Sequence, residues 1–180
     1  MGMKHCDLGI AVVGAGRIGT LRARIAAKHP AVRFLAISDR DPARARRLAE
    51  QAGADLHSGD NEEVIRDANV TAVIVSTPEQ LHTRPVLQAL ELGRPVLVEK
   101  PIGFSLTEAD AILTTLRTTK GKLCVGYSRR YKECFLRAKE HMRHGRLGRI
   151  VGATARVYNS RAQAFAILKR GAWGREKWKK

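Results

Sequence analysis

The sequence of 180 residues lacks a long apolar run and an apolar leader. Its longest apolar stretches, such as residues 8–16 (LGIAVVGAG), are far shorter than the roughly 20 residues that a transmembrane helix needs. Residues 1–10 contain no signal-peptide core, and Cys6 stands where a myristoylation signal prefers Ser or Thr. We therefore expect a cytoplasmic protein that has no contact with a membrane.

Cysteine is also scarce. The three cysteines, Cys6, Cys124 and Cys134, are an odd number and do not follow the spacing of a metal site. We expect reduced thiols, which are usual in the cytoplasm. His141 and His144 lie three residues apart but have no further ligands to complete a site, so the sequence predicts no metal centre.

Acidic residues are few in the last third of the chain. Residues 1–120 contain 16 Lys and Arg against 14 Asp and Glu, whereas residues 121–180 contain 17 against 3. A basic surface of this kind can bind nucleic-acid phosphates without specificity. However, the sequence has no zinc module, RNP-type motif or recognition-helix pattern, and only 5% of its residues are aromatic. Nucleic acid is therefore a disfavoured partner.

Short apolar runs alternate with helical patterns from residue 8 to residue 126. The runs predict buried strands of a parallel sheet at 8–14, 32–38, 71–76, 94–99 and 122–126, with a short edge strand near 54–57. Asp41 followed by Pro42 predicts a helix start, as do capping boxes at 77–80 and 105–108. The alternation predicts a doubly wound, Rossmann-type α/β fold with right-handed crossovers.

The pattern changes after residue 126. Residues 131–144 predict a helix that ends at Gly145, and residues 148–160 alternate as a strand does. We assign 1–126 to a dinucleotide-binding domain and 127–180 to a connecting helix and the first strand of an incomplete second domain. Such a strand has exposed edges, so we expect either that it pairs with another chain or that the segment is poorly ordered. The tail at 169–180 follows neither period and resembles a premature end, which suggests a truncated chain.

A glycine motif follows the first strand and opens a helix, in the order Gly14-x-Gly16-x-x-Gly19. Gly14 permits a tight turn, Gly16 lets the backbone approach a diphosphate, and Gly19 lets helix and strand pack closely. Free N–H groups and the positive end of the helix dipole lie at Arg17 and Ile18. Because no Lys-Ser/Thr pair follows, the motif is not a P-loop. It predicts a dinucleotide site.

Asp39 bears on the choice between NAD and NADP. It lies twenty residues past Gly19, at the end of the second strand, where a carboxylate accepts hydrogen bonds from ribose hydroxyls. Its charge would repel a 2′-phosphate, which favours NAD. Arg40 and Arg44 follow closely and can hold such a phosphate, although both also suit a solvated helix surface. NAD is the favoured cofactor, and NADP is the alternative.

Three further segments, with the glycine motif, resemble the Gfo/Idh/MocA family of oxidoreductases over about residues 8–160. They are STPEQLH (76–82), VEKP (98–101) and GYSRRY (126–131). The resemblance implies an NAD(P)-binding Rossmann domain followed by a mostly antiparallel α+β domain. It also implies hydride transfer to or from a sugar, polyol or cyclitol, and often a homo-oligomer.

Lys100 is the candidate catalytic residue. Ligands of a doubly wound sheet bind beyond the carboxyl ends of its strands, where Ser76, Thr77, Glu99 and Lys100 lie. The resemblance assigns to Lys100 a hydrogen bond to the substrate oxygen, which stabilises negative charge as hydride moves. The residues alone also allow a lysine that merely reaches water at a strand end.

Other roles rest on the resemblance. It places Thr77 and Pro78 beside the cofactor, and it implies a cis bond between Lys100 and Pro101. His82 is expected either to line the cleft or to lie on a helix surface.

The resemblance assigns Arg130 to the substrate, with Tyr127 as a second contact, whereas we expect Arg129 to be merely exposed. The Asp and His of the family's second domain, which carry the hydroxyl proton, have no counterpart: no Asp follows Asp110 and no His follows His144. The resemblance therefore predicts a dehydrogenase activity, which this chain on its own need not carry out. The alternative is a non-catalytic dinucleotide-binding module.

Overall fold

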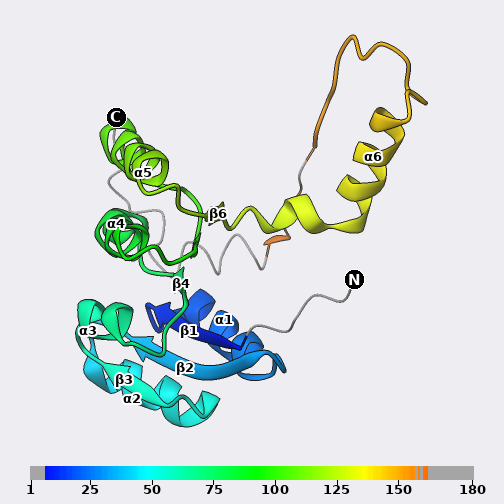
Figure 1. Ribbon diagram of the computed structural model, residues 1–180. Helices are drawn as coiled ribbons and strands as arrows, with labels where there is room; N and C mark the ends of the chain where they lie inside the picture. The colour runs from blue at the N-terminus through cyan, green and yellow to red at the C-terminus, as the bar shows by residue number, and fades with distance from the viewer. Residues whose placement is uncertain (1–6, 157, 159, 162–180) are drawn as a thin grey trace. The chain divides into compact units, whose positions relative to one another are not determined.

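The computed structural model describes residues 7–156, 158 and 160–161 (Figure 1). The chain divides into two compact units, the first ending at Arg130 and the second beginning at Tyr131. No helix in the described part of the chain is both long and apolar enough to cross a membrane.

A parallel sheet of six strands forms the centre of the first unit, in the order β3-β2-β1-β4-β5-β6. Its strands are β1 (Leu8–Val13), β2 (Val32–Ser38), β3 (Leu56–Ser58), β4 (Ala72–Val75), β5 (Val96–Val98) and β6 (Leu123–Val125). Every neighbouring pair is parallel. This order confirms the doubly wound Rossmann-type fold.

Helices cover both faces of this sheet. They are α1 (Arg17–Ala27), α2 (Pro42–Ala52), α3 (Asn61–Arg66), α4 (Thr83–Glu91) and α5 (Leu106–Thr118). On one face Val12 packs with side chains of α1 and α2, and on the other Val13 packs with side chains of α3, α4 and α5. Because successive strand residues point to opposite faces, a continuously apolar strand needs cover on both sides.

Two of the three expected helix starts are confirmed. The Asp41 side chain accepts hydrogen bonds from the first turn of α2, and Ser105 and Glu108 form a reciprocal capping box at α5. The capping box expected at 77–80 is wrong. A short 3₁₀ turn, η1 (Glu79–Leu81), intervenes, and α4 begins only at Thr83. The Thr77 hydroxyl therefore caps no helix.

The second unit contains α6 (Glu133–Arg143), which lies after the 3₁₀ turn η2 (Ser128–Tyr131). Gly145 follows α6 with a φ of 67°, as a helix end requires. None of the described residues of 148–160 is in a strand, and the strand expected there, as one that pairs with another chain, stays a prediction. A strand needs a neighbour to pair its N–H and C=O groups, and the described part of this unit offers no other strand.

Leu90 of α4 is fully buried in the core between α4 and the sheet. Leu90→Ala is expected to lower the free energy of unfolding by about 2–5 kcal/mol, because it removes apolar contacts and leaves a cavity. Leu106→Ala is the control, since Leu106 is 84% exposed, and should change stability by less than about 0.5 kcal/mol. Urea unfolding followed by circular dichroism measures both, and equal midpoints would contradict this core.

Candidate functional site

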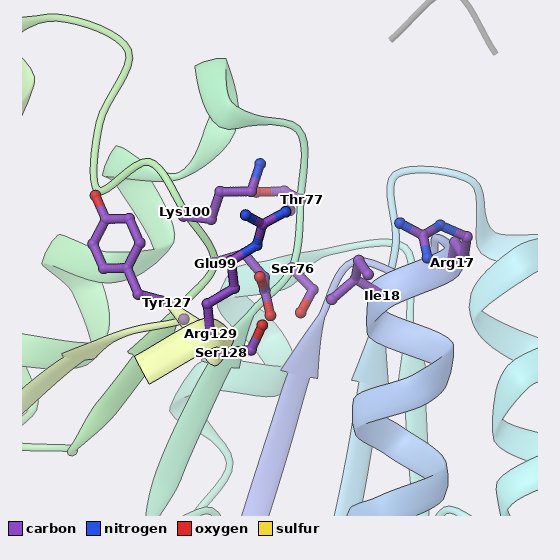
Figure 2. A pocket seen from close by; sticks show the side chains of 10 residues that line it. Arg17, Ile18, Ser76, Thr77, Glu99, Lys100, Tyr127, Ser128 and Arg129 are labelled. Carbon is purple, nitrogen blue, oxygen red and sulfur yellow. The ribbon is translucent and has the colours of Figure 1, made fainter. Parts of the chain in front are cut away.

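Two hollows lie at the carboxyl ends of the strands. The larger, of about 1080 Å³, extends along the ends of β1 and β2 past Asp39 and Arg40. The smaller, of about 380 Å³, is shown in Figure 2 and is lined by Arg17, Ile18, Ser76, Thr77, Glu99, Lys100, Gly126, Tyr127, Ser128 and Arg129. Ser76 and Thr77 line both hollows, so the two adjoin at these residues.

The glycine motif forms the wall between β1 and α1. Gly14 has a φ of 101°, and a Cβ there would lie 2.8 Å from the carbonyl group of Ser76. A Cβ at Gly19 would lie 1.7 Å from the carbonyl oxygen of Gly14. Gly16 differs, because nothing in the described chain lies within 4 Å of a Cβ built there. The protein itself therefore requires glycine at 14 and 19, whereas the backbone at 16 is open to a ligand.

The N-terminus of α1 has no side-chain cap. Gly16 is its N-cap, and no side chain of the described residues bonds to its first turn, which begins at Arg17 and Ile18. The N–H groups of a first helical turn have no partner within the helix. An anion beside Gly16 would satisfy them and would also be favoured by the helix dipole.

Asp39 is nearly buried and is fixed in place by the backbone. Its Oδ2 accepts from the N–H of Ala15 at 2.8 Å, and its Oδ1 accepts from the N–H of Asp41 at 2.9 Å. The Arg44 guanidinium lies 3.1 Å from Oδ1 and also pairs with Asp41 at 3.2 Å. Arg40 is exposed and makes no ion pair with the described residues. The carboxylate is thus tied to the end of the glycine motif.

The hydroxyls of Ser76 and Thr77 are buried and have no hydrogen-bond partner among the described residues. Leaving such a group unsatisfied costs about 1–3 kcal/mol, and structures rarely keep one without a reason. Both residues lie where the two hollows meet. They are therefore available to a molecule that spans them.

Glu99 is held by an arginine that no sequence motif indicates. Arg22, on α1, donates to Glu99 Oε1 from Nη2 at 2.6 Å and from Nε at 3.0 Å. A Cβ at Gly126 would lie 3.0 Å from Glu99 Oε2, so any larger residue there would press on the carboxylate. Lys100, the next residue, is exposed and pairs with no described residue. Its ammonium is free to serve a ligand.

His82 lies behind the site, and lines neither hollow. It is 1% exposed, with Nδ1 2.8 Å from the carbonyl oxygen of Pro101 and Nε2 3.0 Å from that of Thr77. The Lys100–Pro101 bond is cis. The imidazole thus links the loop that carries Thr77 to the loop that carries Lys100.

The two neighbouring arginines of GYSRRY differ in position. Arg129, which sequence reasoning left as an exposed residue, lines the smaller hollow, and Arg130 does not. Both lie in η2, where the 3₁₀ geometry of about three residues per turn makes neighbouring side chains point in different directions. Tyr127 also lines the hollow, although in Figure 2 its hydroxyl points away from Ser76. The substrate role of Arg130 stays a prediction.

These features match a known family. The model of the oxidoreductase family with an NAD-binding Rossmann fold, Gfo/Idh/MocA, matches residues 8–127. The chain belongs to the Gfo/Idh/MocA family.

Curated and solved Gfo/Idh/MocA relatives extend beyond this chain. A scyllo-inositol 2-dehydrogenase (NAD(+)) of Bacillus subtilis (strain 168) is 33% identical over 149 residues, covering 82% of this chain and 43% of the relative. A myo-inositol 2-dehydrogenase of Thermotoga maritima is 31% identical over 140 residues, covering 78% and 42%. The crystal structure of scyllo-inositol dehydrogenase from Lactobacillus casei with bound NAD(H) and scyllo-inositol has a TM-score of 0.73 and 26% identity, covering 79% and 42%. The chain spans less than half the length of these relatives.

The residues of this Gfo/Idh/MocA chain fit NAD, which is its cofactor. The open backbone at Gly16 and the uncapped first turn of α1 fit the diphosphate. Asp39 fits the adenosine ribose, and Ser76 and Thr77, whose hydroxyls have no partner among the described residues, line both hollows. The family match confirms the predicted NAD binding and the predicted Rossmann fold. The individual contacts to the cofactor stay predictions.

Gly16→Val separates cofactor binding from folding. Its Cβ meets nothing in the described chain, so the thermal unfolding temperature should stay within about 2 °C of the parent, a change well under 1 kcal/mol. NADH affinity should fall by tenfold or more, because the side chain occupies the approach to the diphosphate. Gly19→Val is the contrasting variant and should lower the unfolding temperature, since its Cβ clashes with Gly14. Fluorescence titration with NADH would refute this site if Gly16→Val bound normally.

Proposed function

We propose that this protein is an NAD-dependent oxidoreductase that acts on a hydroxyl or carbonyl group of a sugar- or cyclitol-like polyol. The observation that carries the proposal is the unpaired ammonium of Lys100 in a hollow that Arg17 and Ile18, the first residues after the glycine motif's Gly16, also line. The relatives named as inositol dehydrogenases support a cyclitol as one substrate class. A homo-oligomer stays a prediction of the family resemblance.

The bound cofactor supplies a hydride acceptor for oxidation of the alcohol, or a hydride donor for the reverse reaction. Lys100 donates a hydrogen bond to the substrate oxygen, on which negative charge develops as hydride leaves the carbon. Because no described side chain competes for its ammonium, all three of its N–H donors remain for the substrate and water. Glu99, held by Arg22, keeps the backbone before Lys100 in place.

Oxidation also releases the hydroxyl proton, which a base must accept. The sequence contains no Asp after Asp110 and no His after His144, so the Asp and His implied by the resemblance are not among these residues. A positioned general base is worth about 10²–10⁴ in rate. A non-catalytic NAD-binding module is the second candidate function, because the one carboxylate that lines the smaller hollow among the described residues, Glu99, is already bonded to Arg22.

The surroundings of Asp39 favour NAD over NADP. A 2′-phosphate would approach a carboxylate that is nearly buried and fixed by two backbone N–H groups, so Asp39 cannot turn away. Arg44, which could neutralise such a phosphate, is already paired with Asp39 and Asp41. Only Arg40 is left as a free cation of this loop in the described chain.

Cofactor discrimination tests the role of Asp39. NADH should bind at micromolar concentration, and NADPH should bind about tenfold or more weakly because of charge repulsion. Asp39→Asn should lower the affinity for NADH and narrow the difference in affinity between NADH and NADPH. Arg47→Gln, a change at an exposed residue of α2, should alter neither affinity. Fluorescence polarisation of the two reduced cofactors measures this, and no binding of either below millimolar would overturn the proposed function.

Lys100→Ala tests the catalytic role and distinguishes the two candidate functions. With NAD and a panel of cyclitols and sugars, any turnover by the parent protein should be lost in Lys100→Ala, because charge on the substrate oxygen is no longer stabilised. NADH absorbance at 340 nm is the measurement, a standard optical signature of the reduced nicotinamide. An absence of turnover in a parent protein that binds NADH would instead favour the non-catalytic module.

A further inference from the structure

The smaller hollow carries an excess of positive charge. Its lining includes the cations Arg17, Lys100 and Arg129 and a single carboxylate among the described residues, Glu99. That carboxylate already accepts two hydrogen bonds from Arg22, which is not part of the lining. Glu99 is therefore neutralised from outside, and the charges that face the hollow are cationic.

The three cations serve different parts of the site. Arg17 is the first residue of α1, beside the open backbone of Gly16, so we assign its positive charge to the cofactor diphosphate. Lys100 and Arg129 lie on the loops after β5 and β6, and neither side chain has an ion pair or hydrogen bond with a described residue. In Figure 2 the side chains of Lys100 and Arg129 both reach the space above Glu99.

A neutral polyol would use only part of this arrangement. One hydroxyl of such a molecule is enough for Lys100, and the guanidinium of Arg129 would then be left to water. A guanidinium presents a planar fork of N–H donors that matches a carboxylate with two parallel hydrogen bonds. Charge-assisted pairs of this kind are stronger than hydrogen bonds to neutral hydroxyls.

We infer that the smaller hollow accepts a sugar or polyol that carries a carboxylate, such as a uronate or an aldonate. Arg129 binds the carboxylate, and Lys100 binds the oxygen at the reacting carbon. This inference rests on the proposed function, because it takes the hollow to be the substrate side of an NAD site. A volume of about 380 Å³ is enough for a small sugar acid.

The test is isothermal titration calorimetry, in which D-glucuronate or myo-inositol is added to the protein saturated with NADH. The ionic strength is held fixed because salt screens exposed charges. D-glucuronate should bind about tenfold or more tightly than myo-inositol, since only glucuronate offers a charged acceptor. Arg129→Gln should remove this difference, and Arg129→Lys should restore part of it, because a lysine keeps the charge without the fork. Arg117→Gln is the matched control, since Arg117 is exposed on α5 and lines neither hollow.

The outcomes are distinct. Equal binding of glucuronate and myo-inositol, or no binding of glucuronate, overturns the inference, while binding of NADH by the same sample leaves the proposed function standing. Acetate binding as tightly as glucuronate also overturns it, because the site would then be a general anion site. A failure of NADH to bind removes the proposed function, and the inference falls with it.

Discussion

The close approach of the glycine motif to the segment after β4 is the contact on which the whole site depends. Gly14 lies against the backbone of Ser76, and Gly19 lies against Gly14, both too closely for any side chain. This packing aligns the ends of β1 and β4 and fixes the start of α1. The diphosphate site and the passage past Ser76 and Thr77 are consequences of the same contact. A substitution at Gly14 or Gly19 therefore disturbs both folding and the cofactor site, whereas a substitution at Gly16 affects the cofactor site alone.

The parts of the structure that follow local rules could be predicted from the sequence. Continuous apolar strands alternating with capped helices gave the doubly wound sheet, and the spacing from Gly14 to Asp39 gave the cofactor site. The capping box at 77–80 failed because the same local pattern serves a 3₁₀ turn that delivers Thr77 to the site. The strand at 148–160 stays a prediction, because a strand is defined by its partner, which a local pattern does not supply.

Contacts between distant segments could not be predicted. Arg22 and Glu99 are 77 positions apart, and their pairing depends on how α1 lies against the end of β5. His82 was expected either in the cleft or at a surface, yet its ring is buried between two backbone carbonyls. Arg129 and Arg130 cannot be told apart by composition, because only the direction of each in η2 distinguishes them. Each of these positions requires three-dimensional information.

The charge pattern also gives the site a direction. A dinucleotide has two nucleotide halves on one diphosphate, so a symmetric groove would accept it either way round. Here the larger hollow contains Asp39, whose carboxylate accepts hydrogen bonds, and the smaller contains Lys100 and Arg129, which donate them. Ribose hydroxyls donate to an acceptor that is fixed in place, and a reacting oxygen accepts from the cations. Because Asp39 is tied to the backbone and Glu99 to Arg22, neither carboxylate can move to reverse this polarity. Under the proposed function, the rigid placement of these two acids, more than the number of cations, orients the cofactor with its reactive end toward Lys100.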